Sequence, residues 1–152
     1  MLLLILEAGT QRFGLAASRI VEVIPAPVLR PMPGLPAFIA GAFNYHGRVV
    51  PVIDLSSLLT GQPSRPLLST RIVMLNFQPS QGGEPLLLGL LAEHATELLS
   101  CPSEDVQPAG VHGLDTPFAG EVLIRPDGLI QELNVDRLLS ANLHEQLFGA
   151  PA

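Results

Sequence analysis

Residues 41–59 of the chain read Gly-Ala-Phe-Asn-Tyr-His-Gly-Arg-Val-Val-Pro-Val-Ile-Asp-Leu-Ser-Ser-Leu-Leu. An apolar segment ends at Tyr45, a tight polar corner follows at His46 and Gly47, and a second apolar segment comes next, which predicts a β-hairpin. Asp54 closes the outgoing strand, where its carboxylate is suited to cap the first turn of a short helix. The rest of the chain can be placed relative to this hairpin.

The composition indicates a folded globular protein. The chain has 152 residues, 47% hydrophobic and 5% aromatic, which predicts a single domain over residues 1–152 with an aliphatic core. A net charge of −6, with no lysine and no basic cluster, argues against nucleic acid or an anionic membrane surface as a partner.

The sequence also predicts the cellular location of the protein. The apolar N-terminal run ends at Glu7, too early for a signal peptide or a membrane span. The single cysteine, Cys101, excludes an internal disulfide and fits a reducing compartment. We therefore expect a cytoplasmic protein without direct membrane insertion.

Short aliphatic or β-branched runs predict further strands at residues 2–6, 13–15, 19–24, 71–77, 121–125 and 128–133. Five prolines within residues 25–36 predict an extended loop that leads into the hairpin, and residues 101–117 read as a second loop. Residues 86–99 fit either a strand or a helix.

The C-terminal segment predicts one helix that is capped by Asn134 and ends at Gly149. Five apolar residues fall on one face of this helix: Val135, Leu138, Leu139, Leu143 and Leu147.

The chain also contains an internal echo. The hairpin at Gly47 leads through an apolar strand to Asp54 and a Leu-Leu pair, and the hairpin at Gly128 leads through an apolar strand to Asp136 and a second Leu-Leu pair. Two copies of this pattern in a β-rich chain predict two similar lobes.

Residue patterns typical of catalysis or cofactor binding are missing from the sequence. The four histidines lack metal-ligand spacing, and neither Cys101 nor any serine lies in a nucleophile motif. We therefore expect a binding protein with no enzymatic activity, cofactor or metal. One alternative stays open, a small hydrolase-like enzyme that uses Asp54 and His46 as an acid-base pair.

Several segments, in their order and spacing, resemble the CheW family of bacterial chemotaxis coupling proteins. The segments are Phe13-Gly-Leu, Ile20-Val-Glu-Val-Ile, residues 33–55, and residues 128–139 with the sequence Gly-Leu-Ile-Gln-Glu-Leu-Asn-Val-Asp-Arg-Leu-Leu. The resemblance implies an all-β fold of two five-stranded SH3-like β-barrel lobes around a shared hydrophobic core, with a C-terminal helix. It also implies that residues 86–99 are largely strand.

The resemblance further implies an adaptor that couples chemoreceptors to a histidine kinase. Its partners would be the regulatory domain of a CheA-type histidine kinase and the cytoplasmic tip of a chemoreceptor. A third alternative is a structural array component that binds the kinase but not the receptor.

By the same resemblance, the residues expected to contact partners lie on one strand and around the hairpin corner: Ile20, Glu22, Gly41, Asn44, His46, Gly47 and Arg48. The Asn-Leu-Arg-Gly corner of the family is Asn-Tyr-His-Gly here, so His46 stands where the family has arginine. Because arginine is always charged and offers a bidentate fork, this difference predicts altered partner choice or affinity.

Overall fold

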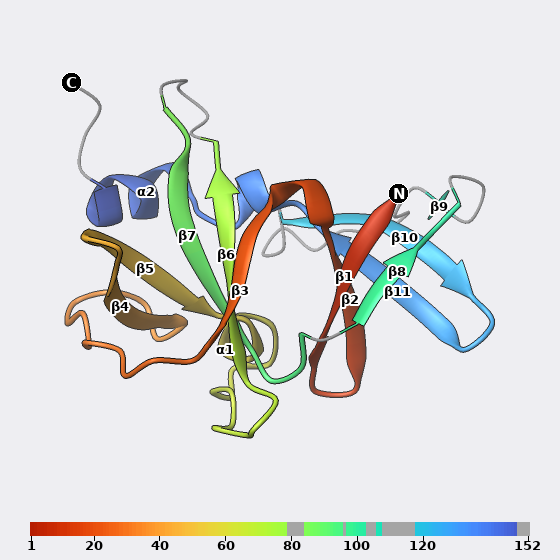
Figure 1. Ribbon diagram of the computed structural model, residues 1–152, viewed down its shortest axis with the longest axis horizontal. Coiled ribbons are helices and arrows are strands. Elements are labelled where there is room, and N and C mark those ends of the chain that lie inside the picture. The colour runs from red at the N-terminus through yellow and green to blue at the C-terminus, as the bar shows by residue number, and fades with distance from the viewer. Residues whose placement is uncertain (79–83, 96, 103–105, 108–117, 149–152) are drawn as a thin grey trace.

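A computed structural model describes residues 1–78, 84–95, 97–102, 106–107 and 118–148. The molecule consists of two β-sheets that form two lobes along its long axis (Figure 1). The strands are β1 (Leu2–Ala8), β2 (Gln11–Ala16), β3 (Ile20–Pro25), β4 (Ile39–Tyr45), β5 (Arg48–Asp54), β6 (Arg71–Phe77), β7 (Leu86–Ala92), β8 (Glu97–Ser100), β9 (Val106–Gln107), β10 (Ala119–Arg125) and β11 (Gly128–Leu133). The helical segments are η1 (Ala17–Arg19), α1 (Leu55–Thr60), η3 (Val135–Arg137) and α2 (Ala141–Phe148).

The two sheets share one pairing pattern. One has the order β3-β6-β7-β5-β4, and the other has the order β8-β1-β2-β11-β10 followed by the two-residue strand β9. In each order the third and fourth strands pair in parallel, and the other neighbours among these five strands pair antiparallel. The prediction of an all-β fold with two similar lobes is confirmed, and residues 86–92 and 97–100 are strands.

The internal echo is visible in the hydrogen bonds at the base of each hairpin. The Asp54 N–H donates to the carbonyl of Phe38 at 2.7 Å, and the Asn134 N–H donates to the carbonyl of Phe118 at 2.6 Å. Each of the two residues then caps a helical segment, Asp54 by accepting from the Ser57 N–H. The structural counterpart of Asp54 is therefore Asn134, not Asp136 as the sequence pattern suggested.

The hydrophobic core lies mainly between the two sheets. It combines buried residues of β1 and β2 in one sheet with buried residues of β6 and β7 in the other, including Leu4, Leu6, Phe13, Leu15, Val73, Leu75, Leu88 and Leu90. A smaller cluster fills each lobe: Leu3, Ile5, Cys101, Leu123 and Ile130 in one, and Val50, Val52, Ile72 and Met74 in the other. The shared aliphatic core is thus confirmed.

The C-terminal helix is the element on which the sequence prediction was partly wrong. Asn134 caps only the short segment η3, and a separate helix, α2, starts after Ser140, whose hydroxyl accepts from the Leu143 N–H at 3.1 Å. The apolar pattern is unaffected by this break, because Leu138, Leu139 and Leu143 all reach the shared core. Gly149 and most of the predicted loop 101–117 lie outside the described residues.

An ion pair connects the two lobes where the chain crosses between the sheets. Arg19 Nη1 donates to Asp136 Oδ2 at 3.0 Å, and Arg19 Nη2 donates to the carbonyl of Asn76 on β6 at 2.7 Å. Asp136 also accepts from the Gln78 N–H at 3.1 Å. The Arg19 hydrogen bond holds the pKa of Asp136 below its usual value.

This lowered pKa predicts a pH dependence of stability. A carboxylate whose pKa is lower in the folded state stabilises that state above its unfolded pKa, and the contribution is lost as the pH falls through the folded pKa. Asp136→Asn should therefore lower the urea midpoint at pH 6 and lose less additional stability than the wild type between pH 6 and pH 3.

The matched control is Asp127→Asn. Arg12 also lowers the pKa of Asp127, but this carboxylate is 65% exposed and its pair connects elements of one sheet only. Its removal should change the midpoint less. If the difference in urea midpoint between the Asp136 variant and the wild type were the same at every pH, the inferred role of the lowered Asp136 pKa would be refuted.

Candidate functional site: the β4–β5 hairpin and its surroundings

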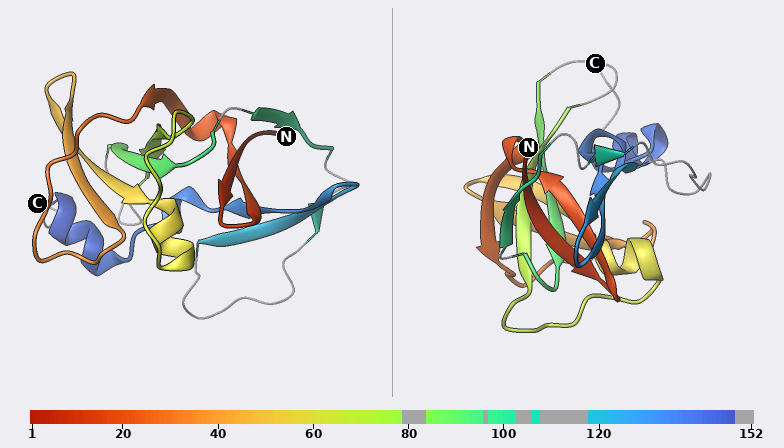
Figure 2. Two further views of the ribbon diagram at one scale, coloured as in Figure 1. Left: turned by 90° about the horizontal axis from the view of Figure 1, so that it is seen from below. Right: turned by 90° about the vertical axis from the view of Figure 1, so that its right-hand side faces the viewer.

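The β4–β5 hairpin projects from one end of the molecule (Figure 2, left). Tyr45 lies opposite Arg48, so His46 and Gly47 form a two-residue turn. Their φ angles are +51° and +88°, the pattern of a type I′ turn, which matches the twist of the flanking strands. Asn44 Oδ1 accepts from the Gly47 N–H at 2.7 Å and fixes this turn. The predicted hairpin corner is confirmed.

One face of the hairpin closes its lobe. β3 and β4 are the two edge strands of their sheet, and the Tyr45 hydroxyl donates to the Glu22 carboxylate across them. This hydrogen bond raises the pKa of Tyr45. The His46 ring packs edge-on against Tyr45, with 4.5 Å between ring centroids.

Tyr45 is a site residue that the sequence analysis missed. Because its position corresponds to leucine in the family corner, its hydroxyl was the one available signal. The structure brings together Glu22 and His46, both predicted, through Tyr45, and it places Arg48 opposite Tyr45 on the neighbouring strand. A carboxylate and an imidazole therefore contact the half-buried Tyr45 side chain, and an arginine lies opposite it.

The predicted partner-contact residues differ in exposure. Five are exposed: Glu22, Asn44, His46, Gly47 and Arg48. Ile20 is half-buried against the shared core, and Gly41 is buried.

Gly41 is required by a close approach of two chain segments. Arg30 forms an isolated bridge to Ala42, with N···O distances of 2.8 and 2.9 Å. A Cβ atom on Gly41 would lie 2.5 Å from the Arg30 carbonyl oxygen, and its φ of +146° is one that side chains rarely adopt. Gly41 thus positions the proline-rich loop on β4.

Gly41→Ala should therefore lower the free energy of unfolding by roughly 3 kcal/mol or more, since backbone strain and a clash with backbone act together. The control is Gly34→Ala, because Gly34 also has a positive φ but no atom near its added Cβ. The control should cost about 1–2 kcal/mol. Equal losses in the two variants, measured by urea denaturation, would show that the close approach is unimportant.

The predicted acid-base pair of Asp54 and His46 is contradicted. Asp54 is 5% exposed, and its carboxylate accepts from the Ser57 N–H and from the backbone and hydroxyl of Ser64. His46 is exposed at the opposite end of β5, a strand of seven residues. At about 3.3 Å per residue, the two side chains lie about 20 Å apart and cannot share a proton.

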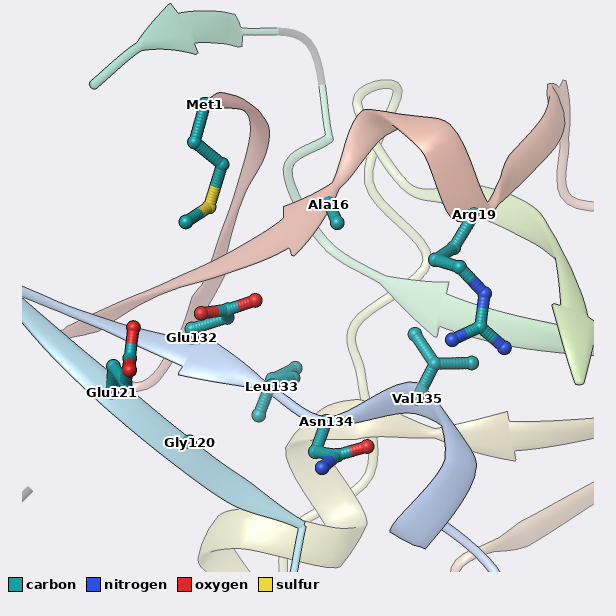
Figure 3. Close-up of a pocket in the computed structure, with 9 residues that line it drawn as sticks. All are labelled: Met1, Ala16, Arg19, Gly120, Glu121, Glu132, Leu133, Asn134 and Val135. Carbon is teal, nitrogen blue, oxygen red and sulfur yellow. The ribbon is translucent and has the colours of Figure 1, made fainter. Parts of the chain in front are cut away.

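A second polar feature is an open cavity of about 430 Å³ that is lined by Met1 and by residues of β2, η1, β10, β11 and η3. Figure 3 shows Glu121 and Glu132 on neighbouring strands, with Arg19 at the other end. Burial raises the pKa of Glu132, and the nearby charge of Glu121 raises it further. In the sequence pattern both glutamates are only residues of predicted strands.

The raised pKa makes ionised Glu132 destabilising. Its unfavourable contribution is absent while the group is protonated and becomes complete as the pH rises through the folded pKa. Glu132→Gln should therefore raise the melting temperature at pH 7, with the gain shrinking toward pH 4.

Glu121→Gln serves as the control for Glu132→Gln. It should give a smaller gain, because it removes only the secondary cause of the shift. A Glu132 variant that is no more stable than the wild type at pH 7 would contradict the inferred charge strain.

The described residues do not group three or more histidine, cysteine, aspartate or glutamate side chains in a way that could hold a metal ion. None of the helices in the described part of the chain is both long and apolar enough to cross a bilayer. The hairpin presents charged, hydrogen-bonding and aromatic side chains.

Several curated bacterial proteins are similar in sequence. The chain is 26% identical over 106 residues to "Chemotaxis protein CheW" of Rhizobium meliloti and 30% identical over 107 residues to "Protein FrzA" of Myxococcus xanthus. Each match covers 70% of this chain, but only 64% and 63% of the length of these two relatives. "Chemotaxis protein CheW" of Treponema pallidum is 22% identical over 93% of this chain and 83% of its own length.

The fold matches the crystal structure of the scaffolding protein TtCheW from Thermoanaerobacter tengcongensis, with a TM-score of 0.82. The match covers 96% of this chain and 92% of that chain at 22% sequence identity. A sequence model of the CheW-like domain matches residues 2–143, nearly the whole length. The chain therefore belongs to the CheW-like domain family.

Proposed function

We propose that the chain is a non-enzymatic adaptor that couples chemoreceptors to a CheA-type histidine kinase in the cytoplasm. The observation that carries this proposal is the corner formed by exposed Glu22, His46 and Arg48 with half-buried Tyr45, in a chain of the CheW-like domain family. Its partners are the regulatory domain of the kinase and the cytoplasmic tip of the receptor. Residues 1–152 act in this role as one domain with two lobes.

The corner is suited to a specific protein contact. Glu22 and Arg48 are both exposed and differ in charge sign, so a partner with the complementary arrangement is selected and oriented. The type I′ turn, fixed by Asn44 and Gly47, sets the backbone at His46 before binding, and the His46 ring packs on Tyr45. Ile20 supports the same surface by packing against the core, and Gly41 supports it by placing the proline-rich loop on β4.

His46 adjusts the affinity of this surface. Arginine at this position would add a permanent charge and a bidentate donor, whereas the imidazole is smaller and packs on Tyr45. A partner that presents a carboxylate to the corner therefore gains from arginine at position 46.

Calorimetric titration of purified chain against a receptor signalling fragment and, separately, against the kinase regulatory domain tests the proposal. We expect micromolar binding to both, and roughly tenfold tighter receptor binding by His46→Arg, the gain of one charge-assisted hydrogen bond. Glu22→Gln should weaken receptor binding, because it loses the corner's only carboxylate among the described residues.

Tyr45→Phe controls for the closure of the lobe, since it removes the hydroxyl contact to Glu22 and keeps the ring. Binding to neither fragment at high micromolar concentration would refute the coupling role. Binding to the kinase domain alone would instead identify a structural array component that does not contact the receptor.

A further inference from the structure

The other face of the same hairpin borders a groove. A cavity of about 420 Å³ lies between the proline-rich loop, the β4–β5 hairpin and α2. Its lining is apolar apart from Arg30 and Gln146, and it includes Met32 and Val49. None of the lining residues is acidic.

The backbone of Arg30 is held in place at the rim of this groove. Both hydrogen bonds of its bridge to Ala42 fix its backbone, and the missing side chain at Gly41 permits that approach. Among the described residues, Arg30 is exposed and has no carboxylate partner, whereas Arg12, Arg19 and Arg65 each pair with an acid. An unneutralised cation on a fixed backbone, in a chain of net charge −6, is a ready contact for a partner's carboxylate.

Val49 supplies the apolar side of the groove. It lies opposite Asn44, one pair away from the turn, and is 76% exposed, at a position where a polar side chain would be better solvated. Because strand residues alternate, Val49 faces away from Arg48 and Tyr45. The hairpin therefore carries two separate contact faces, one polar and one mainly apolar.

We propose that this groove docks a protein segment that presents a carboxylate next to an aliphatic side chain, the carboxylate on Arg30 and the aliphatic group between Met32 and Val49. The inference rests on the proposed coupling function and names the chemistry of one partner at a second face of the same hairpin. A concave groove on an acidic protein favours a protein segment over an anionic lipid surface, which is flat and repelled.

Arg30→Glu and Val49→Asp test this assignment in the intact chain. Each should weaken binding to the receptor fragment or to the kinase regulatory domain at least about tenfold. The weakening by Arg30→Glu should shrink in 0.5 M NaCl, because salt screens the lost attraction. The milder variant Arg30→Gln should fall between the wild type and Arg30→Glu.

Two matched controls are available outside the groove. Arg137→Glu reverses another exposed arginine, and Leu68→Asp replaces a leucine that is 98% exposed. Both controls should bind like the wild type. Melting curves of all variants check that the fold is intact. We expect it to be, because the changed side chains are exposed.

The outcomes separate this inference from the coupling proposal. Suppose the wild type binds one or both fragments and the groove variants bind them with the same affinity. The inference that the groove docks a partner would then be wrong. If the wild type binds neither fragment, the coupling proposal fails, and the groove is then judged by NMR titration with the peptide acetyl-Glu-Leu-Leu-Glu-amide. Shifts confined to residues around Arg30 and Val49, and absent in Arg30→Glu, would support the groove, and no such shifts would overturn it.

A lipid ligand is tested in parallel. Wild-type chain should not sediment with phosphatidylglycerol vesicles. Sedimentation that is lost in Arg30→Glu would overturn the assignment to a protein segment.

Discussion

The packing of one sheet on the other is the interaction on which both lobes depend. β1 and β2 belong to the sheet that the last strands complete, so this lobe is built from both ends of the chain, whereas strands β3 to β7 of the other sheet follow one another without interruption. Aliphatic side chains of both sheets meet in the shared core, where burial is worth about 25 cal/mol per Å² of apolar surface. A partly exposed ion pair contributes about 1 kcal/mol at most, so the pair of Arg19 and Asp136 adds little to the contact between the lobes beyond this core.

The β10–β11 and β4–β5 hairpins, each with a two-residue turn, carry different surface chemistry. At the tip of the β10–β11 hairpin, Asp127 is neutralised by Arg12 of β2 at 2.6 Å. At the β4–β5 hairpin, Arg48 has no carboxylate partner among the described residues. Arg30, which pairs with β4 at Ala42, has none there either. The first hairpin is therefore satisfied within its own sheet, while the second leaves two cations directed outward.

Much of the fold followed from local sequence. The hairpin, the Asp54 cap and the apolar strands are set by residues close together in the chain, and these predictions held. The break after η3 did not follow, because Leu138, Leu139 and Leu143 keep a helical spacing across it. Contacts between distant segments, such as Arg30 with Ala42 and Tyr45 with Glu22, depend on how the sheet curls, which no local pattern encodes. For this reason the sequence identified the corner but missed Tyr45 and the groove.

The Tyr45 hydrogen bond to Glu22 gives one carboxylate two tasks, since it both closes the lobe and lies on the exposed corner. A substitution at position 46 that introduces a stronger donor would compete with Tyr45 for that carboxylate. Positions 22, 45 and 46 therefore form an epistatic unit: the effect of any one replacement depends on the residues at the other two. Lineages that exchange histidine for arginine at this corner should change residue 45 as well, so that barrel closure and recognition drift together.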